Sequence, residues 1–305
     1  MMKTSVALLF AVLCSSCCWS LPQAPAKRVS ALAAGAGSGV HESRELWRDE
    51  RRSRDVPVRI YTPAVTTGRL PVVIFSHGIG EDRDSYAYIG RGLASNGFMA
   101  VHITHAGTDK AVLKSGYRKL YQATKDQNNW RNRPLDVSFV LDQLSKRPDV
   151  DMDRIAVAGH SAGAFTAFAL AGVTGSNGEN LRDDRVRVII PMSMPRIEGV
   201  NYDGVRIPAL NITGTCDSSI IYRTRPVHRR VPFEQTHATR QYLVTIDRVN
   251  HNTFSNATDP HHDAILRLTI AFLRAWLLGD QNARAFFDEP GMVTVDKAVM
   301  TVERK

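Results

Sequence analysis

The chain has 305 residues, of which 43% are hydrophobic and 23% are charged, and 39 Lys and Arg against 30 Asp and Glu give a formal net charge of +9. This composition excludes a disordered or collagen-like chain. At roughly 150 residues per domain, the length suits two domains or one large α/β domain with a sizeable core. Three of the four cysteines lie within the first 18 residues, which leaves Cys216 without an evident partner and excludes a disulfide framework.

The N-terminal segment has the pattern of an export signal. A basic start precedes an apolar run over residues 5–13, which is too short to span a bilayer, and an Ala-x-Ala pattern ends at Ala26. We therefore expect residues 1–26 to be the signal peptide of a secreted or periplasmic protein. A lipid anchor through Cys17 or Cys18 is the alternative.

Short β-rich runs alternate with helical stretches through the middle of the chain. The expected strands cover residues 57–61, 71–76, 98–104, 154–158, 186–192, 209–213 and 241–246. The expected helices cover residues 86–95, 134–145, 162–171 and 263–278. Several strands are uninterrupted apolar runs such as VVIF and VIIP, which is typical of strands buried on both faces. The pattern predicts one α/β domain over residues 45–280, with a mostly parallel central sheet flanked by helices.

Two segments flank this predicted domain. Residues 27–44 include a run of Ala, Gly and Ser that lacks side chains able to build a core, so we expect a flexible linker there. Residues 281–305 are interpreted as a C-terminal extension.

The motif Gly-His-Ser-Ala-Gly over residues 159–163 is the most informative feature of the sequence. An apolar strand ends at Ala158 and a helix of small residues begins at Ala162. A GxSxG between a strand and a helix is the nucleophile elbow, a turn tight enough to require glycines on both sides of the serine. We therefore predict Ser161 as a nucleophile; the alternative is a Gly-rich turn with an incidental serine.

A serine alcohol needs a general base and an acid that orients the base. In this arrangement they follow in the chain order Ser, acid, His, at the ends of later strands. Asp217 ends an apolar strand that closes in a Gly turn, which makes it the preferred acid. Asp203 and Glu198, which follow the preceding strand, are the alternatives.

The predicted base is His251, which follows the strand over residues 241–246. His261 and His262 lie at the start of the last helix, where a histidine is more often solvated or capping. His237 precedes the strand and is expected at the opposite edge of the sheet.

The oxyanion formed during acyl transfer needs preorganised N–H donors. We expect one from the amide of Ala162, directly after the nucleophile, and one from the amide of Ile79 in the Gly-containing loop after the strand over residues 71–76. His77 in that loop is interpreted as a structural brace.

Together these motifs resemble the α/β-hydrolase superfamily, and within it the dienelactone-hydrolase-like and platelet-activating-factor-acetylhydrolase-like esterases. The resemblance depends on residues 75–80, 153–163, 213–217 and 250–254. It implies an α/β-hydrolase fold and ester hydrolysis through a Ser–Asp–His triad and an acyl-enzyme, with no metal and no organic cofactor. A serine nucleophile departs from true dienelactone hydrolases, which use a cysteine.

Substrate choice is expected to depend on three long connections at the carboxyl edge of the sheet, over residues 106–133, 193–206 and 218–239. The third connection carries a basic cluster, which either attracts an acidic substrate or forms a solvated face. Its members are Arg223, Arg225, His228, Arg229 and Arg230.

The expected function is hydrolysis of a small-molecule, lipid or polymer ester, with weak association with a membrane surface as a further option. Two alternatives remain open: a basic, non-catalytic binding protein on the same fold, and an amidase or peptidase. The pI near 9.6 permits the first, but the sequence has no nucleic-acid-binding motif. The sequence does not indicate an oligomeric state.

Overall fold

A computed structural model describes residues 18–21, 27–28 and 39–305. Apart from residues 18–21, the predicted signal peptide lies outside the described residues. So does most of the predicted linker.

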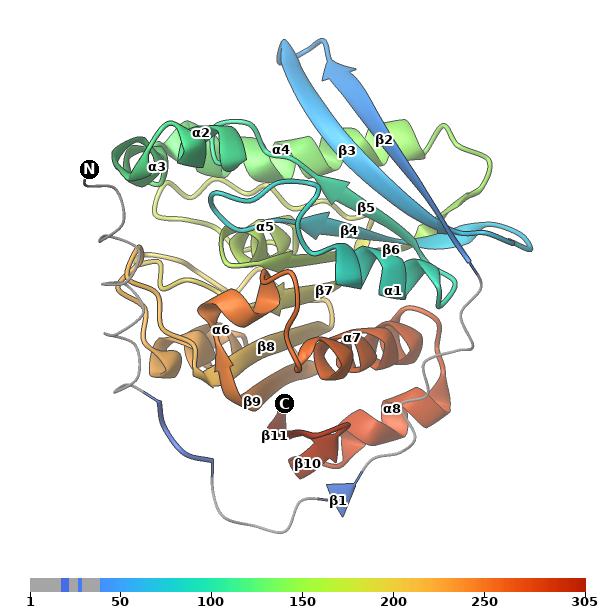
Figure 1. The fold of residues 1–305 in the computed structure, drawn as a ribbon, viewed down its shortest axis with the longest axis vertical. Helices are drawn as coiled ribbons and strands as arrows, with labels where there is room; N and C mark the ends of the chain where they lie inside the picture. Colours follow the sequence, from blue (N-terminus) through green and yellow to red (C-terminus); the bar gives the residue numbers. More distant parts are fainter. Residues whose placement is uncertain (1–17, 22–26, 29–38) are drawn as a thin grey trace, which may run out of the picture.

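A single mixed sheet organises the described chain (Figure 1). Its strand order is β1-β10-β11-β9-β8-β7-β6-β4-β5-β3-β2. The central strands β9, β8, β7, β6, β4 and β5 pair in parallel, as predicted. These strands are β4 (Leu70–Ser76), β5 (Met99–Ile103), β6 (Val150–His160), β7 (Val186–Met192), β8 (Ala209–Cys216) and β9 (Gln241–Asn250). Their carboxyl ends lie at one edge of the sheet, where the candidate site is found.

Antiparallel strands extend the sheet on both sides, beyond the predicted boundaries of 45 and 280. On one side, β3 (Arg54–Pro63) pairs with β5, and β2 (Val40–Asp49) pairs with β3. β2 begins inside the predicted linker, and most of its side chains are not buried because it is an edge strand. Its polar sequence therefore lacks the apolar run that marks a central strand.

The C-terminal residues are part of the same sheet, which corrects their interpretation as an extension. Helix α8 (Gln281–Asp288) precedes the hairpin of β10 (Gly291–Val295) and β11 (Ala298–Arg304). β11 pairs antiparallel with β9, and β1 (Lys27–Arg28) pairs with β10. The hairpin alternates buried and partly exposed residues, the pattern of a sheet margin with one covered face.

Helices cover both faces of the sheet. Val73 and Phe75 of β4 point into a core shared with α1 (Ala87–Ala94), α7 (His262–Trp276) and α8. Their neighbours Val72 and Ile74 point the other way, into a core shared with α4 (Gln127–Leu144) and α5 (Ala162–Leu170). The strand is buried on both faces because successive side chains alternate between two apolar layers.

The predicted central strands and helices are found within a few residues of their expected bounds, except that α4 begins seven residues before the expected 134. The connection over residues 106–133 is more regular than expected, since it contains α2 (Lys110–Lys114), α3 (Tyr117–Ala123) and the start of α4. The connection over residues 218–239 contains a 3₁₀ helix, η1 (Pro226–Arg230), and α6 (Val231–Gln235). A second 3₁₀ helix, η2 (His251–Phe254), follows β9.

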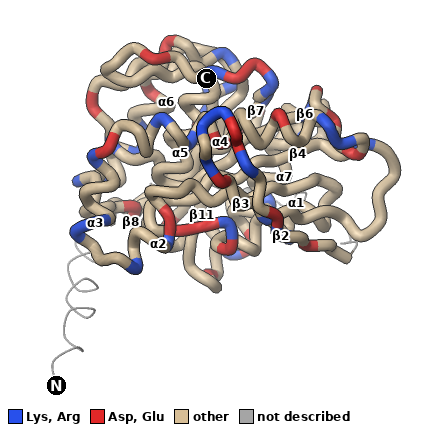
Figure 2. Tube along the Cα trace, turned by 90° about the horizontal axis from the view of Figure 1, so that it is seen from above, with Lys and Arg blue, Asp and Glu red and all other residues tan. Residues whose placement is uncertain are grey.

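No helix in the described part of the chain is both long and apolar enough to cross a bilayer. The surface charge is mixed: Figure 2 shows basic and acidic positions interspersed along the trace. The basic residues are therefore not gathered on one side of the trace in this view.

Candidate active site

Ser161 lies in a sharp turn between β6 and α5. Its backbone has φ 54° and ψ −116°, a conformation that costs energy for any residue with a Cβ. The flanking glycines are required by space. A Cβ on Gly159 would lie 2.3 Å from the carbonyl oxygen of Gly163, and a Cβ on Gly163 would lie 1.9 Å from that of Ser76. The close approach of strand, turn and helix therefore leaves no space for a side chain at either position.

The three residues predicted as nucleophile, base and acid meet at the carboxyl edge of the sheet. His251 Nε2 lies 3.1 Å from Ser161 Oγ, and His251 Nδ1 lies 3.1 Å from Asp217 Oδ1. Asp217 is completely buried, whereas the His251 side chain is 18% exposed. The imidazole therefore bridges a hydroxyl and a buried carboxylate and is itself partly open to solvent.

Asp217 has four polar partners. Thr213 Oγ1 donates to its Oδ2 at 2.8 Å and Ser193 Oγ donates to its Oδ1 at 2.8 Å, while Arg229 Nη2 lies 3.0 Å from Oδ1. Burial alone would raise the pKa of Asp217, but the Arg229 charge and the hydrogen bonds from His251 and Ser193 outweigh it and hold that pKa below its usual range. The acid is therefore ionised at neutral pH.

The surroundings of His251 favour its neutral form. Burial lowers the pKa of its imidazole, and the Arg229 guanidinium, with Nη2 3.0 Å from Nδ1, lowers it further, while Asp217 acts in the opposite direction. The His160 ring lies 4.7 Å from the His251 ring, and burial holds the pKa of His160 well below its ordinary value. A neutral imidazole with Nδ1 protonated presents a lone pair on Nε2 toward Ser161.

The loop after β4 lies beside the elbow. Neither the Ile79 amide nor the Ala162 amide donates a hydrogen bond to an acceptor in the described part of the chain. The neighbouring amide of Gly78 donates to Tyr86 Oη at 3.2 Å, and this hydroxyl can donate to His160 Nδ1 at 2.8 Å. Tyr86 therefore connects the loop to the residue that precedes the nucleophile.

The buried side chains of Arg133 and His77 form hydrogen bonds that hold the same loop in place. Arg133 donates to the carbonyl oxygen of His77, and its other nitrogen atoms donate to Thr108 Oγ1 at 2.7 Å and Thr166 Oγ1 at 3.1 Å. His77 Nδ1 donates to the Gly78 carbonyl at 2.6 Å, and Nε2 accepts from the amide of His105 at 3.0 Å. His77 thus has the bracing contacts predicted for it.

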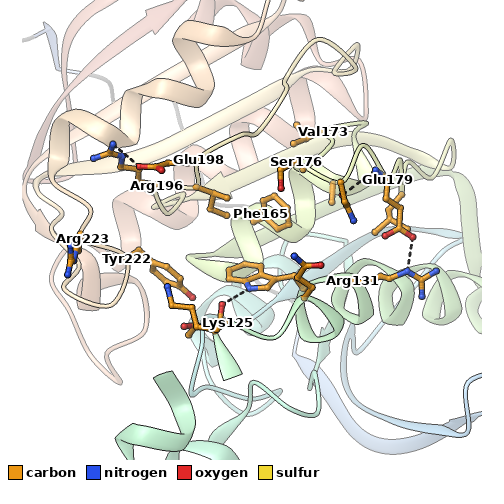
Figure 3. Close-up of a pocket in the computed structure, with 18 residues that line it drawn as sticks. Lys125, Arg131, Phe165, Val173, Ser176, Glu179, Arg196, Glu198, Tyr222 and Arg223 are labelled. Carbon is orange, nitrogen blue, oxygen red and sulfur yellow. Dashed lines mark hydrogen bonds and ion pairs between the residues drawn. The ribbon is translucent and has the colours of Figure 1, made fainter. Parts of the chain in front are cut away.

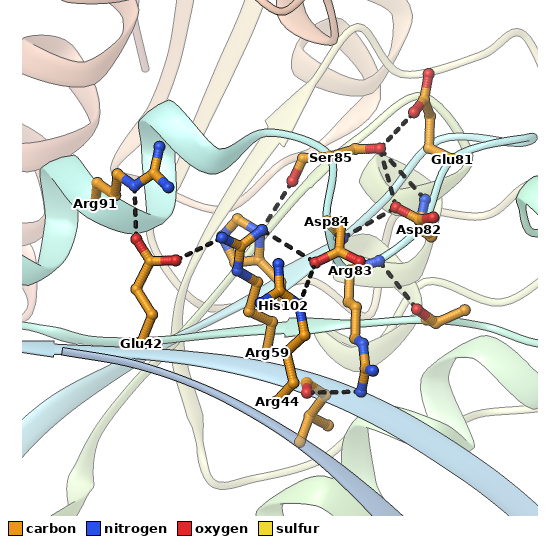
Figure 4. A network of polar contacts seen from close by, with 12 residues as sticks. Glu42, Arg44, Arg59, Glu81, Asp82, Arg83, Asp84, Ser85, Arg91 and His102 are labelled. Atoms are coloured by element: carbon orange, nitrogen blue, oxygen red, sulfur yellow. Dashed lines mark hydrogen bonds and ion pairs between the residues drawn. The ribbon is translucent and has the colours of Figure 1, made fainter.

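A network of ion pairs and hydrogen bonds holds Arg83 and Asp84, which follow the loop after β4, against the β2–β3 hairpin (Figure 4). Asp84 pairs with Arg44 of β2 at 2.9 Å and with Arg59 of β3 at 3.0 Å. Arg83 donates to the carbonyl oxygens of Glu45 at 2.6 Å and Val58 at 2.9 Å. The mixed-charge hairpin therefore fixes the chain between the loop after β4 and α1.

The alternative acids and bases have other partners. Asp203 pairs with His237 at 3.8 Å, and both side chains are largely exposed. Glu198 pairs with Arg196 at 3.1 Å. His261 pairs with Asp259 at 2.8 Å, and His262 Nε2 lies 2.8 Å from the carbonyl oxygen of Thr253. These contacts distinguish them from the group around Ser161.

Cys216, directly before Asp217, forms a disulfide with Cys18, so the prediction that it has no partner is wrong. The prediction failed because Cys18 had been assigned to the signal peptide and thereby removed from the pairing. The Trp19 amide also donates to the Thr215 carbonyl at 3.2 Å. A chain cleaved after Ala26 would lack this bond, so the bond and that cleavage site exclude each other in one mature molecule.

The basic cluster of the third connection divides into members with different surroundings. Arg229 is completely buried beside Asp217. Arg230 pairs with Glu303 at 2.6 Å and Glu234 at 3.0 Å. Arg223 and Arg225 are exposed. The run is therefore neither a uniformly solvated face nor a single binding patch.

The three predicted specificity connections meet around a cavity of about 550 Å³ (Figure 3). Residues 124–131, 196–198 and 222–223 contribute to it, one stretch from each connection, together with residues of α5 and of the segment after it. Phe165 is the lining residue nearest to Ser161 along α5.

Sequence reasoning missed the residues that support the predicted ones: Tyr86, Arg133, Ser193, Thr213 and Arg229. Their polar or charged side chains suggest solvent exposure. Except for Thr213, which lies four residues before its partner Asp217, their hydrogen-bond partners are more distant in the sequence. For Arg229, position in a conspicuous basic run concealed its burial.

In the described residues, no group of three or more His, Cys, Asp or Glu side chains could hold a metal ion.

Comparison with known proteins identifies esterases as relatives of this chain. The chlorophyllase family model matches residues 38–182, which include the loop after β4 and the elbow. Platelet-activating factor acetylhydrolase of Cavia porcellus is 28% identical over 151 residues, which are 37% of this chain and 34% of that protein. The chain has the α/β-hydrolase fold and is similar to serine esterases over these residues.

Other relatives of this α/β-hydrolase carry esterase names. A bifunctional acetylxylan esterase/xylanase of Neocallimastix patriciarum is 24% identical over 180 residues, 58% of this chain and 23% of that protein. Chlorophyllase type 0 of Chenopodium album is 30% identical over 115 residues, 38% of this chain and 32% of that protein. The chain thus aligns with about a third of the acetylhydrolase and of the chlorophyllase. The family match contains Ser161, whereas Asp217 and His251 lie beyond it.

Proposed function

We propose that this α/β-hydrolase cleaves carboxylic esters through an acyl-enzyme, with Ser161 as nucleophile, His251 as base and Asp217 as the orienting acid. The observation that carries the proposal is the imidazole of His251 between Ser161 Oγ and Asp217 Oδ1, at 3.1 Å from each. The esterase names of the relatives support the same reaction.

The reaction follows from this geometry. His251 Nε2 takes the Ser161 proton as Oγ attacks the ester carbonyl, and Asp217 stabilises the imidazolium. The amides of Ile79 and Ala162, which have no other acceptor in the described chain, would hold the oxyanion. When the resulting tetrahedral intermediate collapses, the bond to the alcohol oxygen breaks, and the alcohol leaves with the proton from His251. Water, deprotonated by His251, then cleaves the acyl-enzyme, releases the acid and restores the Ser161 hydroxyl.

The test is hydrolysis of p-nitrophenyl esters of increasing chain length, combined with labelling by a serine-directed organophosphate. We expect stoichiometric labelling at Ser161 and a fall in kcat of several orders of magnitude in Ser161→Ala. The matched control is Ser43→Ala, which changes an exposed serine of β2. Near-wild-type esterase rates in Ser161→Ala would overturn the proposal. Folded protein that is neither labelled nor active would favour a binding protein, and cleavage of amides over esters would favour a peptidase.

We also propose that the protein is exported and that processing leaves Cys18 in the mature chain. The signal-like sequence supports export, and a Cys18–Cys216 disulfide suits an oxidising compartment. The test is the intact mass of protein recovered from outside the cytoplasm, with and without reductant. A mature chain that starts at Lys27 would contradict retention of Cys18, and protein found only in the cytoplasm would contradict export.

A further inference from the structure

The cavity at the three connections has a specific chemical character, and the role inferred for it rests on the proposed esterase function. Its best-defined wall is aromatic. Trp130 of α4 contacts Phe165 of α5 edge-on, with ring centroids 5.3 Å apart, and contacts Tyr222 at 6.0 Å with the ring planes at 64°. Aromatic rings arranged in this way offer both faces and edges to another ring.

The aromatic wall lies close to the nucleophile along the chain. Phe165 follows Ser161 by four residues of α5, so it lies about one helical turn, or ~6 Å, further along the helix. Tyr222 follows the acid by five residues, at the start of the third connection. Two of the three wall residues thus come from segments that also carry the nucleophile and the acid, although none of Ser161, Asp217 and His251 lines the cavity itself.

The charges at the rim are not balanced. Arg131 pairs with Glu179 at 2.7 Å, and Arg196 pairs with Glu198 at 3.1 Å. Lys125 and Arg223 also line the cavity and have no acidic partner within 4.0 Å among the described residues. In Figure 3 both lie on the side of Tyr222, away from the Arg131–Glu179 pair.

The aromatic wall also contains a polar atom without a hydrogen-bond partner. Tyr222 Oη is buried and makes no hydrogen bond with the described residues. A buried hydroxyl without a partner loses the hydrogen bonds that water would provide, so an acceptor on a ligand would relieve that cost. The aromatic wall, the two cations and this hydroxyl thus match a ring with an anionic substituent.

We propose that the cavity binds an aromatic group that carries a carboxylate, attached on one side of the ester bond that Ser161 attacks. Trp130, Phe165 and Tyr222 contact the ring, and Lys125 and Arg223 bind the carboxylate. An acetyl group is too small to use these contacts, so for an acetyl ester the cavity holds the alcohol part.

The test compares two matched pairs of esters that place the carboxylate on either side of the scissile bond. Monomethyl terephthalate is compared with methyl benzoate, and 4-carboxyphenyl acetate with phenyl acetate. In at least one pair we expect kcat/KM to be about tenfold higher for the anionic ester. The double variant Lys125→Gln/Arg223→Gln should lose this preference, so that the anionic and the neutral ester of that pair are hydrolysed with similar kcat/KM. Arg225→Gln, an exposed change on the same segment and outside this cavity, should retain the preference.

Binding provides a readout that does not need turnover. Monomethyl terephthalate should bind the Ser161→Ala protein in calorimetry and bind at least tenfold more weakly when the Lys125 and Arg223 changes are added. Equal rates within both ester pairs, or binding that is unaffected by the double variant, would overturn the cavity assignment. If the wild-type protein shows no preference for the anionic esters but its hydrolysis still depends on Ser161, the cavity assignment fails and the proposed esterase function is unaffected. Hydrolysis that persists in Ser161→Ala contradicts the esterase mechanism instead.

Discussion

The guanidinium of Arg229 contacts both the acid and the base of the site, with Nη2 3.0 Å from Asp217 Oδ1 and 3.0 Å from His251 Nδ1. Its other nitrogen atoms donate to the carbonyl oxygens of Ser193 at 2.8 Å, Met194 at 2.7 Å and Asp217 at 3.2 Å. The cation is thus fixed by the ends of two strands. It keeps Asp217 ionised and disfavours a second positive charge on His251.

The first prediction concerns the pH dependence of Arg229→Gln. His251 is the active base when neutral, and its lowered pKa extends activity toward lower pH. Removing the cation raises the pKa of His251, so the acid limb of kcat/KM moves to higher pH. The other groups that face His251 are Asp217, His160, Ser161 and Ser193, and the variant retains all of them.

Arg229→Lys retains a charge and should retain the acid limb with a lower rate, because three carbonyl contacts are weakened. Arg225→Gln is the exposed control. The measurement is kcat/KM against pH, with circular dichroism to verify folding. An unchanged acid limb in Arg229→Gln, or a shift of the same size in Arg229→Lys, would contradict the role of the charge.

The second prediction concerns Tyr86→Phe, which removes the acceptor of the Gly78 amide and the donor to His160. The loop that carries Ile79 loses its link to the elbow, so we expect kcat to fall about tenfold with little change in KM. Tyr88→Phe is a matched control, because the Tyr88 hydroxyl is buried without a hydrogen-bond partner in the described chain. Steady-state kinetics of both variants decide the point, and an equal effect of the two changes would refute it.

The third prediction concerns the space at the elbow. A Cβ on Gly163 would lie 1.9 Å from the Ser76 carbonyl oxygen, so Gly163→Ala forces backbone to move at the centre of the sheet. We expect loss of soluble protein or a large fall in Tm. Gly39→Ala is the control, since its nearest neighbour would be 3.4 Å away. A soluble Gly163→Ala enzyme with unchanged Tm would show that the turn tolerates a side chain.

The fourth prediction concerns the disulfide. Cys18 and Cys216 are separated by 198 residues, and for a loop of this length the chain-entropy model gives a stabilisation on the order of 5 kcal/mol. Cys18→Ser should therefore unfold at a lower urea concentration than the oxidised protein. Reductant should destabilise the wild-type protein and leave the variant unchanged. Identical urea midpoints for the oxidised wild type and the variant would show that the bond is absent or without effect.

The sequence was most informative where a local pattern determines the structure. Apolar runs marked the parallel strands, and the glycines around Ser161 marked a turn that admits no Cβ. The order of the chain then indicated Asp217 and His251, because both follow strands that end at the same edge. Their role in catalysis stays a prediction until activity is measured.

The sequence was less informative where a partner far along the chain determines the structure. The edge strand β2 carries charges because only one of its sides is paired, so it did not resemble a strand. Arg229 resembles its exposed neighbours, and only the fold shows which of them is buried. Cys18 was misinterpreted because its position suggested targeting, although its partner lies 198 residues away.

Residues 217–230 contribute both to the cavity and to the electrostatics of the acid and the base. Tyr222 and Arg223 form the wall and rim of the cavity, while Arg229 controls the ionisation of the acid and the base. Grafting this stretch from a relative would therefore change substrate preference and pH profile together. Engineering that aims at specificity alone has to work with point changes at the cavity and leave the arginine in place.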